Sequence, residues 1–93
     1  MIELSARPRL ARKVKLRFDS RSGKYVLLVP EKGLALNRTA SAVAQLCTGE
    51  HSVVAIIEQL LGEYVDAPRK QIEAEVLSFL QALDDRGLIE VSS

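Results

Sequence analysis

The chain has 93 residues, 47% of them hydrophobic, and this predicts one small folded domain rather than a disordered chain. It has one cysteine and no apolar run near the roughly 18 residues that span a membrane, which excludes an internal disulfide and a transmembrane helix. The net charge of +1 conceals an asymmetry, because residues 1–38 carry +7 and residues 39–93 carry −6. Since no signal-peptide pattern is recognisable either, we expect a cytoplasmic protein.

The first half of the chain has the two-residue period of β-strands. Residues 12–19 alternate between apolar and mostly charged side chains, which predicts a half-buried strand. Residues 20–23 read as a turn. Residues 24–30 are apolar on both faces, which favours the central strand of an antiparallel hairpin.

A third, very short strand is predicted for Leu34, Ala35 and Leu36, after a turn formed by Pro30, Glu31 and Gly33. At the other end of this half, residues 1–9 are expected to form a flexible N-terminal arm of a single domain that spans residues 1–93.

Three helices follow, and the first two begin at good capping residues. Asn37 is expected to cap a helix whose apolar residues recur over 40–47 and which ends at Gly49. Ser52 is expected to cap a second helix over residues 53–64.

The third helix is expected to start near Asp66 and Pro68 and to end before Gly87. Residues 88–91 then form an extended apolar tail. The order βββααα predicts an α+β domain in which a three-stranded antiparallel sheet covers three helices.

A catalytic or metal site is not apparent in the sequence. Cys47 and His51 are the only cysteine and histidine, and Gly49 between them makes a shared helical face improbable. Asp84 and Asp85 are adjacent on a helix and so face different directions. Glycine-rich phosphate-binding motifs are lacking. We therefore expect a protein that is not an enzyme and has no cofactor or metal of its own.

The basic strand leaves a nucleic-acid function open. Lys13, Lys15 and Arg17 share one strand face beside three helices, an arrangement typical of a winged-helix DNA-binding protein. The third helix, however, carries acidic groups that phosphates would repel. These acidic residues are Glu73, Glu75, Asp84 and Asp85. A basic face that is simply solvated explains the charges more economically.

Peptide binding by strand addition accounts for more features together. An extended peptide could pair with the backbone of Leu34, Ala35 and Leu36, because this edge strand leaves the sheet unfinished. Its alternate side chains would enter an apolar groove between that edge and the third helix. We assign the helix wall of this groove to Ile72, Glu75, Val76 and Phe79. The same edge could instead pair two copies of the chain in a strand-exchanged homodimer.

Over residues 8–91 the sequence resembles the PqqD family. The resemblance lies in the segments VKLRFD, GKYVLLVPEKGLALNRTA, LCTGEHSV and FLQALDDRGLIEV. Its most specific residues are Leu28, Pro30, Glu31, Leu36, Asn37, Thr39, Ala40, Leu46, Cys47 and Gly49. Two positions depart from the family, which often has Asp where this chain has Thr48 and Glu75.

The resemblance implies a winged helix-turn-helix-like domain without enzymatic activity that acts as a peptide chaperone in pyrroloquinoline quinone (PQQ) biosynthesis. Related domains take the leader of a ribosomally made peptide as an extra strand beside the third strand and the third helix. The implied partners are the precursor peptide PqqA and the radical SAM enzyme PqqE, to which the iron–sulfur cofactors belong.

Overall fold

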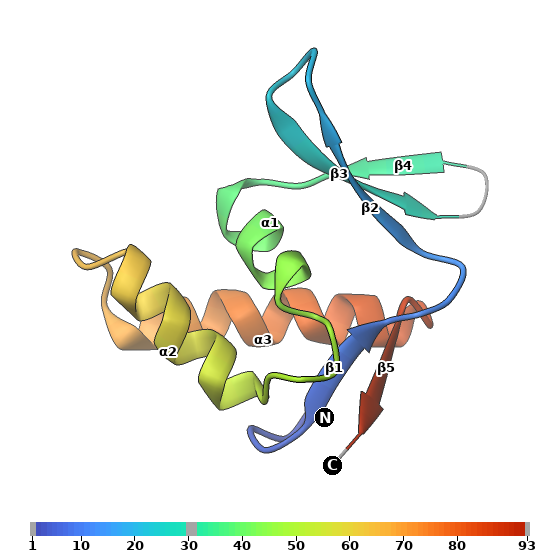
Figure 1. Cartoon of the computed structure of the whole chain (residues 1–93). Coiled ribbons are helices and arrows are strands. Elements are labelled where there is room, and N and C mark those ends of the chain that lie inside the picture. Colours follow the sequence, from blue (N-terminus) through green and yellow to red (C-terminus); the bar gives the residue numbers. More distant parts are fainter. Residues whose placement is uncertain (1, 30–31, 93) are drawn as a thin grey trace.

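The described part of the chain, residues 2–29 and 32–92 of a computed structural model, contains five strands and three helices (Figure 1). The strands are β1 Arg7–Leu10, β2 Lys15–Asp19, β3 Lys24–Val29, β4 Lys32–Ala35 and β5 Ile89–Ser92. The helices are α1 Arg38–Gln45, α2 Val53–Glu63 and α3 Arg69–Asp85. The predicted α+β class is confirmed, and the C-terminal tail forms β5. The turn residues Pro30 and Glu31 lie outside the described residues.

β2, β3 and β4 form an antiparallel sheet with β3 in the centre, as predicted. The carboxylate of Asp19 organises the turn between β2 and β3. It accepts hydrogen bonds from the Arg21 N–H at 3.0 Å and the Ser22 hydroxyl at 3.1 Å. Gly23 completes this turn with a φ of 70°, a left-handed conformation that glycine adopts without a Cβ clash.

β1 and β5, near the two ends of the chain, form a second antiparallel sheet. This pairing corrects the expectation of a flexible arm over residues 1–9. Ala6 and Pro8 are buried, while Arg7 and Arg9 are exposed, so β1 has the alternation of a half-buried strand. The strand was missed because a proline between two arginines reads as polar loop, and its partner strand lies at the far end of the sequence.

The loop after α1 borders the second edge of β1. The Leu10 N–H donates to the Cys47 carbonyl at 3.1 Å, and the Gly49 N–H donates to the Pro8 carbonyl at 2.9 Å. α1 therefore ends at Gln45 and not near Gly49 as expected, because the chain leaves the helix to bond with β1.

The start of α2 is tied to the N-terminal segment. Ser52 caps the helix, as predicted. The N–H groups of Val53 and Val54 donate to the carbonyls of Ala6 and Leu4, at 2.8 Å and 3.0 Å. Amides in the first turn of a helix have no partner within it, so residues 4–6 satisfy groups that would otherwise need water.

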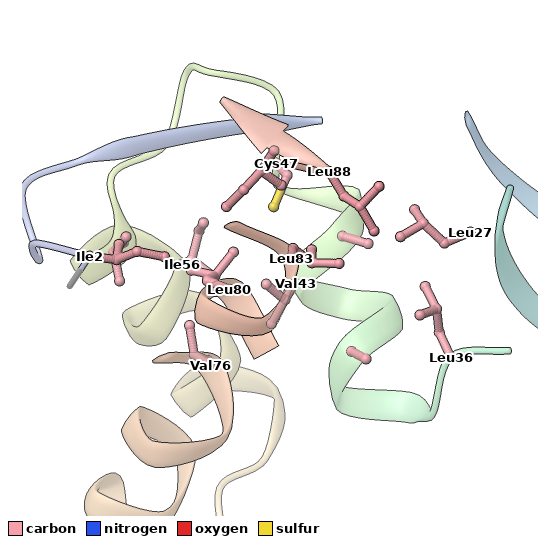
Figure 2. Close-up of a cluster of buried hydrophobic side chains, with 14 of the residues drawn as sticks. Ile2, Leu27, Leu36, Val43, Cys47, Ile56, Val76, Leu80, Leu83 and Leu88 are labelled. Carbon is pink, nitrogen blue, oxygen red and sulfur yellow. The ribbon is translucent and has the colours of Figure 1, made fainter. Parts of the chain in front are cut away.

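The core lies between the inner face of the three-stranded sheet, the helices and β5 (Figure 2). Figure 2 shows side chains from every layer converging on it, among them Leu27, Leu36, Val43, Ile56, Leu80 and Leu88. Its members are mainly aliphatic, as the shortage of aromatic residues predicts. None of the helices in the described ranges is long and apolar enough to cross a membrane.

Candidate functional site

β4 is an edge strand of its sheet, with β3 as its neighbour. The backbone groups of an antiparallel strand point alternately to its two sides. The Leu36 N–H donates to the Tyr25 carbonyl of β3 at 3.2 Å, so Leu34, two residues earlier, also points its backbone groups at β3. The N–H and C=O groups of Gly33 and Ala35 therefore point outward, which leaves two donors and two acceptors for an added strand.

The observed strand begins two residues before the predicted one and ends one residue before it. β4 is Lys32–Ala35, and Leu36 follows it with its side chain 6% exposed in the core. Leu34 is half-buried on the same face of the sheet, whereas Ala35 is exposed. Of the three predicted edge residues, Ala35 offers outward backbone groups, Leu34 bonds to β3, and Leu36 anchors the strand to the core.

A groove of about 490 Å³ separates the start of α1 from one flank of α3. Its lining residues are Asn37, Thr39 and Ala40 from the start of α1 and Ala74, Glu75, Ser78, Phe79 and Ala82 from α3. Since α1 begins three residues after β4 ends, the groove lies close to the C-terminal end of the open edge. Two of the predicted helix residues, Glu75 and Phe79, are brought to this groove.

Ile72 and Val76 do not line it, and here the sequence prediction is corrected. Their side chains are 2% and 0% exposed because they belong to the core-facing stripe of α3 with Leu80 and Leu83. Phe79, which the sequence grouped with them, lies at the border of this stripe and is half-buried.

Several residues on the groove wall were not predicted from the sequence. Ala74, Ser78 and Ala82 follow one another at intervals of four and share a flank of α3. The helical spacing from Glu75 to Ser78 and Ala82, three and seven residues on, could have identified this flank. Their small side chains leave room beside Phe79.

Asn37 has two roles at the site. Its side-chain oxygen accepts the Ala40 N–H at 2.8 Å, which confirms the predicted cap of α1. Its side-chain NH₂ group supplies two further donors, and this residue lines the groove. On the opposite wall the exposed Glu75 supplies carboxylate oxygens that accept hydrogen bonds.

The thiol of Cys47 is unsuited to catalysis. It is 4% exposed, and burial raises the pKa of the thiol to about 12, so it stays protonated at neutral pH. The described residues hold no group of three or more His, Cys, Asp and Glu side chains that could bind a metal ion.

The surface of α3 also bears on the nucleic-acid alternative. Glu75, Asp84 and Asp85 are exposed on this helix. A winged-helix protein places its last helix in the DNA groove, where these carboxylates would face phosphates. The site geometry therefore favours a peptide over DNA.

The fold is that of a peptide-recognition domain. It is similar to the solution structure of the PqqD part of Methylobacterium extorquens PqqCD, described as a stand-alone RiPP recognition element, RiPP being a ribosomally synthesized and modified peptide. The TM-score is 0.76 at 40% identity, with 97% of this chain and 95% of the other covered. It also has the fold of TbiB1, solved in complex with a leader peptide, with a TM-score of 0.73 at 21% identity over 88% of this chain and 94% of that one.

The chain belongs to the PqqD family, since the model of coenzyme PQQ synthesis protein D matches residues 24–89. A PqqA binding protein of Rhodopseudomonas palustris strain BisB5 is 44% identical over 85 residues, which cover 91% of this chain and 82% of the relative. The Thr48 hydroxyl, where the resemblance led us to expect an Asp, accepts the Glu50 N–H at 3.3 Å, a bond that an Asp carboxylate could also accept.

Proposed function

We propose that this protein binds the precursor peptide PqqA in PQQ biosynthesis by taking it as an extra strand on the open edge of β4. The observation that carries the proposal is the outward direction of the Gly33 and Ala35 backbone groups, next to a groove along α3. Main-chain bonds at such an edge hold an extended peptide whatever its sequence, and side-chain pockets select which peptide is held.

The groove beside α3 determines which peptide sequences bind. Side chains of the added strand point alternately to the two sides of the sheet, so every second one faces α3. Apolar side chains of the peptide would pack on Phe79 and Ala40, and polar groups would bond with Asn37 and Glu75. Ile72, Val76 and Leu36 support these walls from the core.

The protein is a carrier and not an enzyme in this proposal. It acts in the cytoplasm as a single domain over residues 1–93 and presents PqqA to the radical SAM enzyme PqqE. The enzyme contributes the iron–sulfur clusters, and the carrier contributes the extended conformation of the peptide. Because the peptide is already ordered on the carrier, its binding to the enzyme costs less conformational entropy.

Fluorescence anisotropy of labelled PqqA, titrated with the protein, tests the first step. We expect saturable binding for PqqA and none for a peptide of the same composition in scrambled order. Cross-linking of PqqA by PqqE, measured with and without the protein, tests the second. Equal affinity for both peptides, or equal cross-linking with and without the carrier, would refute the proposal.

The open edge also supports a second candidate, a homodimer in which two copies pair through β4. Unpaired edge strands readily associate with one another. Sedimentation velocity over a wide concentration range tests this candidate. A dimer that PqqA converts to a monomer would show that peptide and copy compete for the edge, whereas a monomer at every concentration would remove the dimer.

A further inference from the structure

We propose that the outer face of the β2–β3–β4 sheet, opposite the helices, is the surface on which an acidic patch of the peptide-processing enzyme docks. This inference rests on the proposed function, because the partner is taken to be the enzyme that receives the peptide. The surface is distinct from the groove, which lies on the helix side of the sheet.

The two faces of β3 differ in exposure at the middle of the strand. Leu27 is 0% exposed and points towards the helices (Figure 2). Its neighbour Leu28 points to the other face and is 36% exposed. Strand residues alternate between faces, so Val26 shares the outer face with Leu28. All three helices lie on the inner side of the sheet (Figure 1), so among the described residues Leu28 is left exposed and Val26 half-buried on the outer face.

Strand register arranges the outer face in two parallel rows. From β2 through β3 to β4, the rows are Lys15, Leu28 and Gly33, and Arg17, Val26 and Ala35. Each row runs from a cation through an aliphatic side chain to a small residue. A protein interface commonly has such an apolar centre with a charged border.

The aliphatic part of this face reaches the open edge. A Cβ atom placed on Gly33 would lie 3.1 Å from Val26 Cγ1 and 3.5 Å from Leu28 Cδ2. The two β3 side chains therefore lean over the glycine and form one continuous patch up to β4. A partner that docks here would bury the whole apolar patch at once, and contiguous exposed apolar patches commonly mark protein interfaces.

Charge identifies the chemistry of the partner. Lys15 and Arg17 are exposed, and the ion pairs among the described residues both involve Arg69 on α3. The cations of the sheet face are thus available to carboxylates of another molecule. Paired charges at the border of an interface raise the association rate and select the partner.

A bound peptide would enlarge the same surface. A strand added to β4 places every second side chain on the outer face, beside Gly33 and Ala35. The enzyme would then contact protein and peptide together and bind the loaded carrier more tightly than the empty one. By linkage, the enzyme must raise the affinity for the peptide by the same factor.

The test compares Arg17→Glu with Lys70→Glu, the same change of charge at an exposed position of α3. Binding of PqqE to each protein, loaded with PqqA, is measured by biolayer interferometry, and PqqA affinity by anisotropy. We expect Arg17→Glu to weaken PqqE binding about tenfold or more and PqqA binding less than about threefold. Lys70→Glu should change both less than about threefold.

A second variant tests the apolar centre without changing charge. Leu28→Thr replaces the aliphatic side chain with a smaller, β-branched one that strands favour, and it should weaken PqqE binding about threefold or more with the fold and the peptide affinity retained. Unchanged PqqE binding in both outer-face variants would overturn the inference while leaving the proposed function intact. If the wild-type protein itself does not bind PqqA, the proposed function is refuted.

Two other occupants would also overturn the inference. If wild-type protein binds duplex DNA with a steep salt dependence that Arg17→Glu abolishes, the face belongs to nucleic acid. If wild-type protein is a dimer that Leu28→Thr dissociates, the face belongs to a second copy.

Discussion

β1 and β4 are both four-residue strands, yet their surroundings differ. β1 has β5 on one side and residues 47–49 on the other, so both of its edges are engaged. Among the residues that the structure describes, β4 pairs with β3 alone, and its outward groups at Gly33 and Ala35 face away from the sheet. Backbone pairing near the chain ends thus stabilises the domain, whereas the edge of the other sheet stays open, and it is there that we propose the peptide binds.

The largest effect is expected in the β1–β5 sheet. Ile89, in β5, is 5% exposed, and Ile89→Ala should lower the free energy of unfolding by about 2–5 kcal/mol through the cavity it leaves. Val91, in the same strand, is 39% exposed, and Val91→Ala should cost less than about 1 kcal/mol. Urea denaturation measures both. Equal losses would contradict a core role for β5.

At the open edge of β4, a substitution should weaken peptide binding and leave stability nearly unchanged. Ala35→Pro removes an outward N–H that β3 does not use, so it should weaken PqqA binding about tenfold or more and change stability by less than about 1 kcal/mol. Ala35→Ser, which keeps the N–H, should bind PqqA normally. Anisotropy and urea denaturation together measure the separation. Unchanged affinity in folded Ala35→Pro would show that this N–H is not used.

The groove should show a smaller and directional effect. Phe79 and Leu77 are both half-buried on α3, but only Phe79 lines the groove beside α1. Phe79→Ala should weaken PqqA binding about fivefold to thirtyfold, as expected for about 1–2 kcal/mol of lost apolar contact. Leu77→Ala should lose comparable stability and keep its affinity. A similar loss of affinity in both variants would place the peptide elsewhere.

The smallest effect concerns alkaline pH on the β1 side. Burial raises the pKa of the Cys47 thiol from 9.0 to about 12, so the folded protein holds this proton more tightly than the unfolded chain. The contribution of Cys47 to stability is therefore complete below pH 9 and is lost as the pH rises towards 12. The melting temperature should fall between pH 7 and about pH 10.5, and it should fall less in Cys47→Ala than in wild type. An identical fall would contradict this origin.

Local patterns predicted most of the open sheet and the helices. The alternation of residues 12–19, the cap residues Asn37 and Ser52, and the two-sided apolar β3 each depend on neighbours in sequence. β1 was not predicted as a strand because its pairing with β5 joins opposite ends of the chain. Such contacts leave little trace in the sequence of either strand alone.

Only part of the candidate site at β4 and α3 could be predicted, because the rest depends on how whole elements pack. The edge strand and Glu75 and Phe79 were recognisable, but assigning Ile72 and Val76 to the groove required the rotation of α3 about its axis. That rotation is set by how the whole helix packs, with Ile72, Val76, Leu80 and Leu83 turned into the core. Which residues of β4 point their backbone groups outward likewise depends on the hydrogen bond from Leu36, just after the strand, to Tyr25.

Amide hydrogen exchange, followed by NMR on isotope-labelled protein with and without PqqA, tests strand addition at β4 most directly. The Leu36 amide, already bonded to Tyr25, should be protected in both states. The Gly33 and Ala35 amides should exchange quickly in the free protein and become protected in the complex, with chemical-shift changes at Phe79 and its neighbours on α3. Saturating PqqA that leaves the Gly33 and Ala35 amides in fast exchange, or shifts only residues 13–17, would contradict the account.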